Sequence, residues 1–549
     1  MINIGLDFGS TYTVVSVYKN GAVNPVLLTM GGSPFVPSIV LKDDMDEFEY
    51  GLAAKQRTGE PDTMLYKAFK MMMTETEEEK LRERGYDETY TPPMITRAYL
   101  NAILEQALEM LKEDAIGLLI VGVPEIWYEE GFETIDCCTK LRDLCQSLDF
   151  VKEVQIVSEP AAASAYFAWN YKEKTQEDFC GHILMVDYGG GTLDITLNEV
   201  STKDGVSNIA VKERTGAGEN EEGKIGKAGI VYMESVVSWA IEQCLGIKPE
   251  VGVEFYQAVD RFEQMLQSKS RKVKDFYQIN EFTDLEGLED VFAKISYMGR
   301  QVPITYGLMA TMYRRVIEPV LKEKLDLMEM AMERYQIDYQ NPGNEEFKIV
   351  LVGGFSNFYL TRKQVQDYFH YSSKDKRWKD MIADQTDCDN AISFGAALIA
   401  NEVIRIPNSA PYSIGIHLDS DGDNYQYAIH YKEEIKYGEP YFQVTPVDEM
   451  PKILIGTDVS EFVINWTEDE KKGYIMELKE EFKEKLREMP FFKENDFPIY
   501  ALGFGLDRSN VLSLYFKKYD DETGQFSDKV HCLELNKMRD VFKLRELKR

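Results

Sequence analysis

Histidine and cysteine are scarce in this sequence, and a long apolar run is missing. The 5 His lie far apart, which leaves little material for a histidine-based metal site. The 7 Cys form no C-x-x-C pair, and an odd number of thiols suits reduced cysteines in a cytoplasmic protein better than a disulfide framework. No apolar run approaches the roughly 20 residues that cross a bilayer, and no basic region with a following apolar stretch opens the chain. We therefore expect a cytoplasmic protein with no membrane partner.

Positive charge is also in deficit. Lys and Arg number 62 against 94 Asp and Glu, which gives a formal net charge of −32. A nucleic-acid partner is disfavoured, because the phosphate backbone would be repelled. The chain has 549 residues, and 44% of them are hydrophobic, which is enough to build cores. At roughly 150 residues per domain, this length favours three or four compact units.

The phosphate-binding motif G-x-x-x-x-G-K-[ST] is absent, so any phosphate must be held by another device. The sequence offers a duplicated pattern of strand, turn and strand instead. Residues 2–18 run through the turn D-F-G-S-T, and residues 183–197 run through the turn D-Y-G-G-G-T. Both segments carry β-prone residues on either side of their glycines, and we predict two hairpins.

Two such turns face to face would form a phosphate clamp. Each turn exposes successive backbone N–H groups, and glycine removes the Cβ that would keep a phosphate oxygen at a distance. Asp7 and Asp187 stand at the two strand ends, and paired carboxylates suit Mg²⁺ that is held through retained waters. One hairpin of this kind is usually an ordinary turn, but its duplication favours the clamp.

Strand, turn and helix alternate up to residue 403, a pattern typical of α/β proteins. Within this region, the small-residue helix that contains GAALIA can pack closely against a neighbour. We place a domain boundary at residues 404–411, because alternating runs begin beyond Pro407. These runs predict a β-rich unit with one helical insert near residues 468–489. Residues 533–549 are amphipathic, and we expect them to form a single capping helix.

Five segments occur in an order that resembles a known family. They are INIGLDFGSTYTVVSVY, VSEPAAASAYFAW, ILMVDYGGGTLDITL, IVLVGGFSNFYL and DCDNAISFGAALIA. Together they resemble the five nucleotide-site segments of the actin-like ATPase superfamily. Within that superfamily they resemble the 70-kDa heat-shock chaperones most, because S-E-P-A-A-A and the D-x-G-G-G-T-[LF]-D turn are typical of those proteins. The resemblance covers roughly residues 1–404.

The resemblance implies a two-lobed actin-like ATPase fold of class α/β, built from duplicated ribonuclease-H-like domains. Nucleotide-binding lobe I would span residues 1–178 with an insert at about 31–95, and lobe II would span residues 179–403 with an insert at about 216–301. Residues 412–549 would form a small β-rich C-terminal domain. APYSIGI and ALGFGLDRSNVLSLYFKK resemble strands of the chaperones' peptide-binding domain, and we expect a shortened form of it without a lid.

The resemblance also implies roles for the residues of the two turns and their surroundings. Contacts with the β- and γ-phosphates would come from Gly9, Ser10, Thr11, Tyr12, Gly189, Gly190, Gly191 and Thr192. The catalytic groups would be Asp7, Lys70, Glu159, Asp187 and Asp194, with Asp7 and Asp187 holding Mg²⁺ through waters. The nucleoside side of the site would contain Glu263, Gly353, Gly354 and Asp389. Lys67 is the alternative to Lys70, because both lysines stand in YKAFKMMMT.

Three features depart from the family pattern. The segment GGFSN stands where the chaperones usually have GGSTR, so Asn357 replaces an Arg, and we expect Phe355 to take over part of the stacking on the base. The expected E-x-x-K-R is incomplete after Glu263. Pro407 and Pro411 replace the apolar linker of the chaperones, which predicts weaker coupling between the nucleotide and the C-terminal domain.

The function that the resemblance implies is that of a slow, Mg²⁺-dependent ATPase of the heat-shock chaperone type. ATP or ADP would modulate the affinity of the C-terminal domain for a polypeptide client or protein partner, with co-chaperones as further candidates. The alternative is an actin-like protein that uses ATP to assemble into a filament or scaffold. The charge of −32 disfavours that alternative, because it makes self-association repulsive at low salt.

Overall fold

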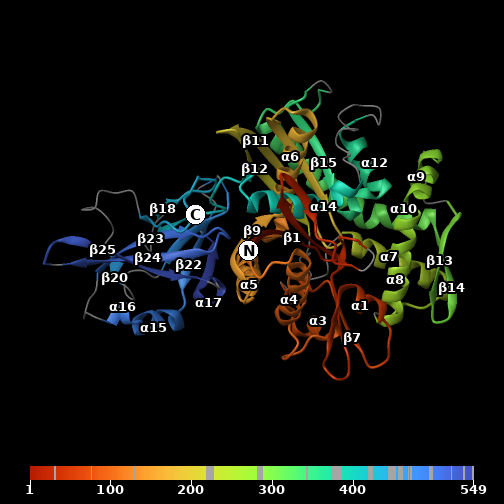
Figure 1. The fold of residues 1–549 in the computed structure, drawn as a ribbon, viewed down its shortest axis with the longest axis horizontal. Helices are drawn as coiled ribbons and strands as arrows, with labels where there is room; N and C mark the ends of the chain where they lie inside the picture. The colour runs from red at the N-terminus through yellow and green to blue at the C-terminus, as the bar shows by residue number, and fades with distance from the viewer. Residues whose placement is uncertain are drawn as a thin grey trace. The chain divides into compact units, whose positions relative to one another are not determined.

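The chain folds into two compact units, which are drawn with their helices and strands labelled in Figure 1. The first unit contains residues 1–126 and 144–406, and the second contains residues 127–143 and 407–549. A computed structural model describes residues 1–29, 32–73, 75, 77–128, 132–217, 228–250, 252–280, 288–341, 344–371, 385–417, 425–442, 453–454, 461–467, 469, 473–493, 499–520, 522–535 and 538–546.

The first sheet of the larger unit has the strand order β3-β2-β1-β8-β9, and β4 pairs with β2. β1 and β2 form the first predicted hairpin, in which Leu6 lies opposite Val15. β8 and β9 follow β1 in parallel, and the apolar run of β8 is typical of a parallel strand buried on both faces. The strands are β1 (Ile2–Phe8), β2 (Tyr12–Lys19), β3 (Ala22–Pro25), β4 (Val36–Pro37), β8 (Ile116–Val123) and β9 (Val151–Ser158).

The second sheet repeats this plan with the strand order β15-β10-β11-β12-β16. β10 and β11 form the second predicted hairpin, and Asp187 lies opposite Asp194 in its register. β15 pairs with β10 in parallel, as β8 pairs with β1. The two predicted hairpins and the α/β class are therefore confirmed. The strands are β10 (Gly181–Tyr188), β11 (Leu193–Lys203), β12 (Val206–Ala217), β15 (Phe347–Val352) and β16 (Ile404–Arg405).

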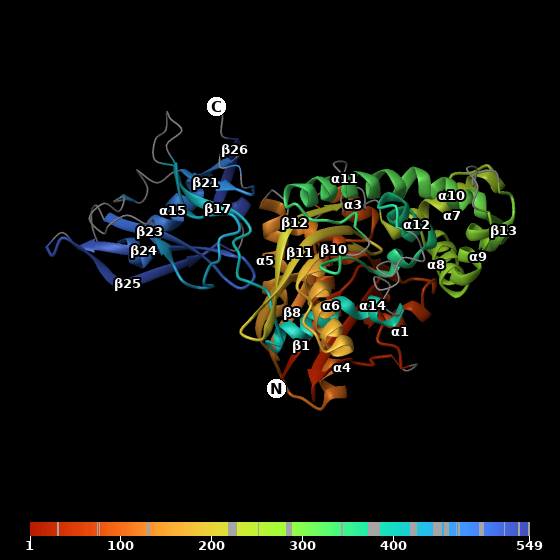
Figure 2. The same cartoon turned by 90° about the horizontal axis from the view of Figure 1, so that it is seen from above.

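Helices lie on both faces of the second sheet. Successive side chains of β10 point to opposite faces, so its apolar residues contribute to two separate cores. Leu184 and Val186 join the core under α11 (Glu318–Arg334), whereas Ile183 and Met185 join the core under α6 (Glu159–Thr175). Figure 2 shows α11 and α6 on either side of β10–β12. Most of β10 is thus covered on both faces, which leaves its strand ends as the places where functional groups can be reached.

The helix α14 (Gln385–Ala400) packs unusually close to its neighbours through small residues. A Cβ at Gly395 would lie 1.7 Å from the carbonyl oxygen of Ala162 on α6. A Cβ at Gly5 of β1 would lie 2.2 Å from the backbone nitrogen of Ala397. The close packing that GAALIA predicted is confirmed, and it holds the start of β1, α6 and α14 together as one support for the turns.

The remaining elements of the larger unit extend from these two sheets. The strands are β5 (Ile39–Lys42), β6 (Phe48–Tyr50), β7 (Met64–Lys67), β13 (Val291–Tyr297) and β14 (Arg300–Thr305). The helices are α1 (Gly51–Gln56), α2 (Phe69–Met72), α3 (Glu78–Glu83), α4 (Pro92–Leu111), η1 (Glu125–Tyr128), α7 (Gly229–Leu245), α8 (Val253–Ser268), α9 (Ser270–Ile279), α10 (Tyr306–Met312), the π-helix η2 (Tyr313–Ile317), η3 (Gly354–Asn357) and α12 (Tyr359–Tyr368). None of the helices in the described ranges is long and apolar enough to cross a bilayer.

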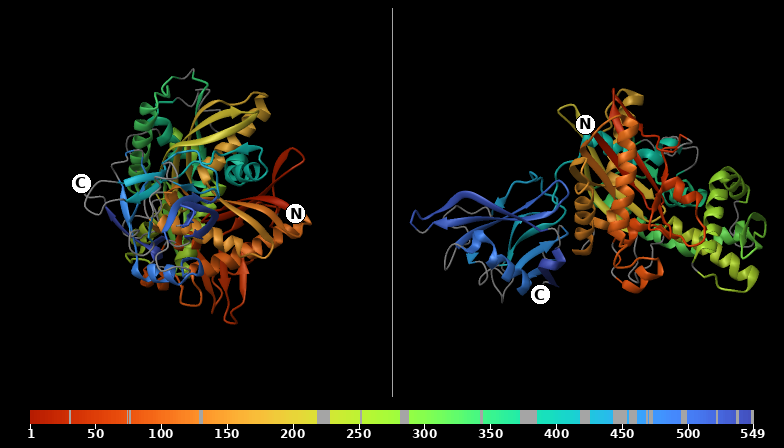
Figure 3. Two further views of the ribbon diagram at one scale, coloured as in Figure 1. Left: turned by 90° about the vertical axis from the view of Figure 1, so that its left-hand side faces the viewer. Right: turned by 60° about the horizontal axis from the view of Figure 1, so that its bottom comes forward.

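The second unit contains two antiparallel sheets with a shared apolar core, drawn in cyan to blue from two further sides in Figure 3. One sheet has the order β18-β17-β21-β22-β26, and the other has β19-β23-β24-β25 with β20 paired to β23. Phe462 of β21 meets Phe504 of β23 edge to face, with ring centroids 5.9 Å apart. The strands are β17 (Ser413–His417), β18 (Tyr425–Ile429), β19 (Tyr441–Phe442), β20 (Ile453–Leu454), β21 (Glu461–Asn465), β22 (Tyr474–Leu478), β23 (Ile499–Leu506), β24 (Leu512–Asp520), β25 (Gln525–Glu534) and β26 (Phe542–Glu546).

Two expectations about this unit need correction. The predicted capping helix of residues 533–549 is wrong: α17 (Met538–Val541) is one turn long, and β26 pairs with β22. Phe542 is 2% exposed, so it adds a buried ring to the core. The predicted helical insert is shorter than residues 468–489, because β22 occupies part of it. The helices there are α15 (Glu480–Glu488) and α16 (Pro490–Lys493).

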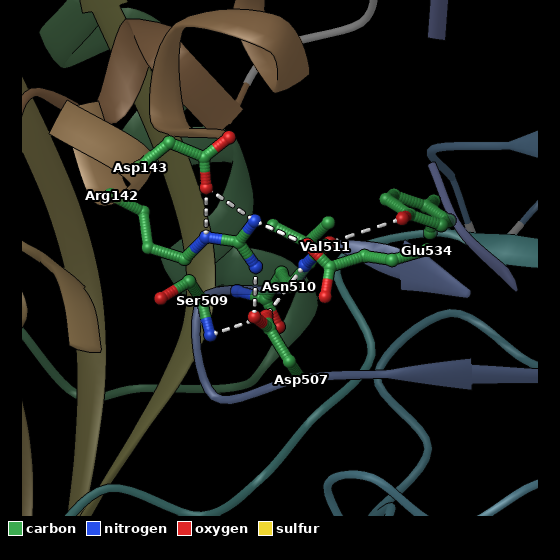
Figure 4. A network of polar contacts seen from close by, with 8 residues as sticks. Arg142, Asp143, Asp507, Ser509, Asn510, Val511 and Glu534 are labelled. Carbon is green, nitrogen blue, oxygen red and sulfur yellow. Dashed lines mark hydrogen bonds and ion pairs between the residues drawn. The ribbon is translucent and has the colours of Figure 1, made fainter. Parts of the chain in front are cut away.

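The second unit also includes residues 127–143, which the sequence pattern placed in lobe I. They contain most of α5 (Phe132–Gln146), from which Asp136 accepts a 2.7 Å hydrogen bond from the Met538 N–H. Arg142, whose side chain is 9% exposed, contacts Asp143 at 2.6 Å and both Asp507 and Glu534 at 2.5 Å. Figure 4 shows these ion pairs, and an N–H of Arg142 reaches each carboxylate. Non-local charge pairing of this kind leaves no periodic signal in the sequence.

We expect Arg142→Ala to lower the free energy of unfolding of the second unit by about 2 kcal/mol, because three carboxylates lose their shared cation. Arg545→Ala is the matched control, since Arg545 pairs with Glu461 at 3.0 Å but is 48% exposed. This control should lose less than about 1 kcal/mol. Urea unfolding of the full chain, read by pulse proteolysis of the second unit, measures both. Equal losses in the two variants would contradict the role given to Arg142.

Candidate functional site

The two glycine turns have the same backbone geometry. In the first, the N–H of Gly9 donates to the carbonyl oxygen of Tyr12 at 3.1 Å. In the second, the N–H of Gly189 donates to the carbonyl oxygen of Thr192 at 3.0 Å. Each hydrogen bond closes a tight turn at the carboxyl end of the first strand of a sheet, so the sequence duplication is also a structural one.

The carbonyl groups of both turns are engaged by neighbouring elements. Ser38 donates to Gly9 through its hydroxyl at 2.6 Å and to Thr11 through its N–H at 2.9 Å. The first N–H groups of α7 donate to the carbonyls of Gly189 and Gly190, at 3.2 and 2.8 Å. Within the described ranges, no hydrogen bond uses the turn N–H groups at positions 10, 11, 190 and 191. These N–H groups are therefore the ones available to an anion.

The two turns approach each other closely at their glycines. A Cβ at Gly190 would lie 2.3 Å from Oγ1 of Thr11, and a Cβ at Gly191 would lie 2.5 Å from Oγ of Ser10. Distances below 3.0 Å force a neighbour to move. The structure therefore brings the two predicted phosphate turns together, one from each sheet.

Acidic residues gather beside these turns. Asp7 is the last residue but one of β1, Asp187 is the last but one of β10, and Asp194 lies opposite Asp187 on β11. Glu159 begins α6, and its Oε1 lies 2.5 Å from Nζ of Lys70, whose side chain is 2% exposed. The predicted catalytic residues are thus neighbours in space, although they come from five separate elements.

Lys67, the alternative to Lys70, lies elsewhere. Its Nζ is 2.8 Å from Oδ1 of Asp260 on α8 and 5.3 Å from the ring centroid of Tyr256. The geometry therefore brings Lys70, and not Lys67, to Glu159 and the carboxylates.

Burial of negative charge shapes the acidity of this cluster. Burial raises the pKa of Asp7 to about 7, with a further increase from Glu159 and a decrease from Lys70. Burial also raises the pKa of Asp187 well above its usual range, and Glu159, Asp194 and Asp7 raise it further. For Asp194, burial and then Glu159 raise the pKa, while the hydroxyl of Thr192 lowers it. The cluster therefore has an excess of negative charge that a bound cation would relieve.

The oxygen atoms of this cluster fit a hard cation such as Mg²⁺. Oδ2 of Asp187 and Oδ2 of Asp194 are buried, and neither has a hydrogen-bond partner among the described residues. Among all the residues that the structure describes, no group of three His, Cys, Asp or Glu side chains is placed to hold a metal ion by itself. An ion here would need waters or a ligand's oxygens to complete its coordination, which suits Mg²⁺.

The Gly353-Gly354 segment lies against the acidic cluster. Gly353 has φ +82°, and a Cβ there would lie 2.3 Å from Oδ1 of Asp187. Phe355 is 5% exposed, and its ring packs on Tyr188 and Tyr232 with centroids 5.2 and 5.3 Å away. The expectation that Phe355 stacks on a base is therefore wrong, because its ring belongs to the core.

Asn357 and Asp389 form a polar pair beyond this segment. Nδ2 of Asn357 donates to Oδ1 of Asp389 at 3.0 Å, and Arg362 donates to Oδ1 of Asn357 at 2.6 Å. Burial raises the pKa of Asp389 to about 6, and Asn357 and Arg362 lower it. Sequence reasoning missed Arg362, which lies five residues after the position where the family pattern has its Arg. The available signal was a basic residue near the start of the helix α12 that follows this segment.

Glu263 lies beside Tyr12 and Lys55. Burial raises the pKa of Glu263, and the ammonium of Lys55 lowers it. Nζ of Lys55 lies 5.6 Å from the ring centroid of Tyr12. No hydrogen bond or ion pair in the described part of the chain joins Glu263 to Asp389. Burial and then the negative charge of Glu263 raise the pKa of Tyr12, which places Glu263 near the first turn rather than with the other nucleoside-side residues.

Comparison with known families matches residues 3–409 to the family described as Hsp70 protein. The chain is similar to the chaperone protein DnaK of Thermotoga neapolitana, with 22% identity over 398 residues that cover 72% of this chain and 59% of that protein. It is also similar to the mitochondrial-type heat shock protein 70 of Encephalitozoon hellem, with 22% identity over 445 residues, 76% of this chain and 66% of that protein. The chain spans about six tenths of the length of the curated relatives it matches.

We expect Gly190→Ala to lower the free energy of unfolding by about 1–3 kcal/mol, because its Cβ would overlap Thr11. Thr11→Ala removes the overlapping Oγ1, so the double variant should recover most of that loss. Gly252→Ala is the control, since no atom lies within 4 Å of its Cβ position. Thermal unfolding without ligand measures these four variants and the wild-type chain. Strictly additive losses in the double variant would show that the turns do not touch at this point.

Proposed function

The chain belongs to the Hsp70 family, and on this premise we propose that it is an ATP-binding chaperone with slow ATPase activity. Its nucleotide state would modulate polypeptide binding by the second unit. One observation carries the nucleotide part of the proposal: two glycine turns face each other with their carbonyls engaged and their N–H groups available, beside a cluster of buried carboxylates. This arrangement suits the charged end of a nucleoside triphosphate with its cation.

Each residue of the cluster has a role in this proposal. The turn N–H groups would bind the β- and γ-phosphates, and Lys70 would add a positive charge that Glu159 keeps in place at 2.5 Å. Asp7 and Asp187 would hold Mg²⁺ through waters, and Asp194 would accept a hydrogen bond from one of those waters. Bound Mg²⁺ would supply neutralisation of the phosphate charge. Because phosphoryl transfer to water depends on positioning and charge neutralisation, these groups suffice for a slow ATPase.

The nucleoside would lie on the side of Gly353, Gly354 and Asp389. Glycine at these two positions keeps side-chain atoms away from a ligand, and nothing lies within 4 Å of the Cβ position of Gly354. Asp389 would accept a hydrogen bond from the sugar or base, while Asn357 donates to its carboxylate and is itself held by Arg362. ATP and ADP are the proposed ligands.

The second unit is the proposed site for a polypeptide client or protein partner, with co-chaperones as further candidates. β18, β26, β19 and β25 stand at the ends of the two strand orders among the described strands. End strands present backbone N–H and C=O groups that an extended chain can pair with. We propose a cytoplasmic location, in keeping with the odd number of cysteines and the lack of a C-x-x-C pair in the sequence.

We predict that a fluorescently labelled unfolded peptide binds the full chain modestly, and that ATP and ADP change its Kd by less than about tenfold. Coupling should be weak because Pro407 and Pro411 stiffen the connection between the two units. Fluorescence anisotropy with Mg·ATP, with Mg·ADP and without nucleotide measures this. Asp187→Asn is the control, since it should keep peptide binding and lose the nucleotide response.

Absence of peptide binding in every nucleotide state would overturn the chaperone part of the proposal. In that case pelleting after ATP addition would decide whether the chain assembles as an actin-like filament or scaffold protein. A nucleotide response that persists in Asp187→Asn would instead remove Asp187 from the proposed Mg²⁺ site.

A further inference from the structure

Glu125 is a buried acid that lies directly behind the candidate site. It follows Pro124 at the end of β8, begins η1, and is 1% exposed. Its backbone N–H donates to Oδ1 of Asp194 at 2.7 Å. Because this hydrogen bond occupies Oδ1, Asp194 keeps Oδ2 for any water or ligand of the site.

The carboxylate of Glu125 is held from two sides. Ser158 donates its hydroxyl to Oε1 of Glu125, and Nη1 of Arg214 on β12 lies 3.3 Å from Oε2. The same Ser158 oxygen accepts a 3.2 Å hydrogen bond from the N–H of Ala161 and thereby caps α6. Glu125 therefore fixes the rotamer of the capping residue at the start of α6.

The residue after this cap is Glu159, whose carboxylate holds Lys70 at 2.5 Å. Glu125 thus reaches Asp194 through its backbone and reaches the Glu159–Lys70 pair through Ser158. The backbone of β12 closes over this contact, because a Cβ at Gly216 would lie 3.2 Å from Oδ1 of Asp194 and 3.3 Å from the nitrogen of Ile126. A shift of Glu125 would be transmitted to both sides of the acidic cluster.

A buried acid paired with a partly exposed arginine contributes little net stability compared with apolar packing. The contacts of Glu125 with Asp194 and with the α6 cap suggest instead that it positions residues of the site. We propose that Glu125 is a positioning residue for nucleotide hydrolysis. It fixes the position of Asp194 on β11 relative to that of Glu159 at the start of α6. This inference rests on the proposed ATPase function and adds to it a residue that the sequence analysis did not select.

The sequence does contain a signal for this residue. Glu125 is a charged residue immediately after a continuous apolar strand and a proline, at the same sheet edge where β1 ends just after Asp7. The carboxyl ends of parallel strands in one sheet meet at one edge, so residues that follow them can reach a common site.

The test compares Glu125→Gln and Glu125→Ala with the wild-type chain. Glutamine keeps the volume and the acceptor for Ser158 but loses the ion pair with Arg214, whereas alanine loses both. We expect the single-turnover rate of ATP hydrolysis to fall about fivefold for Gln and about 30- to 100-fold for Ala. The Kd for Mg·ADP should stay within about threefold of wild type in both variants, because the turns that bind the phosphates are unchanged.

Asn198→Ala is the matched control for loss of a buried polar link between β11 and α6. Nδ2 of Asn198 donates to Ser164 at 2.8 Å and to Thr196 at 2.7 Å, and its residue is 0% exposed. We expect this variant and Glu125→Ala to lower the melting temperature to a similar extent, but Asn198→Ala should keep the hydrolysis rate within about twofold of wild type.

The outcomes separate this inference from the proposed function. If the wild-type chain hydrolyses ATP and both Glu125 variants do so at the same rate, the positioning role is overturned and the ATPase function is not. So would a loss in Asn198→Ala as large as in Glu125→Ala, because the effect would then follow stability. If Glu125→Ala does not fold, a Gln variant at the wild-type rate overturns the inference by itself. A wild-type chain that binds no nucleotide would overturn the ATPase function and this inference together.

Discussion

The crowding of negative charge around one ammonium is the constraint on which the candidate site depends. Glu159, Asp187 and Asp194 are each at most 6% exposed, Asp7 is partly buried, and Lys70 is the buried cation in contact with Glu159. Such an arrangement is unfavourable without further compensation, which is why burial raises the pKa values of the three aspartates. Stability alone does not favour a cluster of this kind, whereas binding of a cation with a phosphate ligand would.

The fold supplies the precision that this cluster requires. Each sheet ends its first strand in a glycine turn, and small residues of α14 and α6 let the supporting elements approach to within backbone contact. Carbonyl groups of the turns are used by Ser38 and by the start of α7, so the peptide units are fixed before any ligand binds. Preorganised N–H donors of this kind bind an anion without a further cost of ordering.

The hairpins, the fold class and the close packing of GAALIA could be predicted because each depends on local patterns of glycine and apolar residues. The capping helix was predicted wrongly because β22 offers an edge to β26, a non-local pairing that overrides helical periodicity. Burial of Phe355 and the choice of Lys70 over Lys67 depend on contacts between distant segments, and so do the links made by Arg142 and Glu125. No single-sequence period records such contacts. The roles of the individual site residues stay predictions.

On the proposed function, the paired turns and the acidic cluster form one site for a nucleotide together with Mg²⁺. Calorimetric titration of the full chain with ATP, once in excess Mg²⁺ and once in EDTA, tests this proposal. We expect saturable binding of one ATP in Mg²⁺ and an affinity at least about tenfold weaker in EDTA, because the carboxylates would then face the phosphates without a cation between them. Equal affinity under both conditions, or no binding in either, would contradict it.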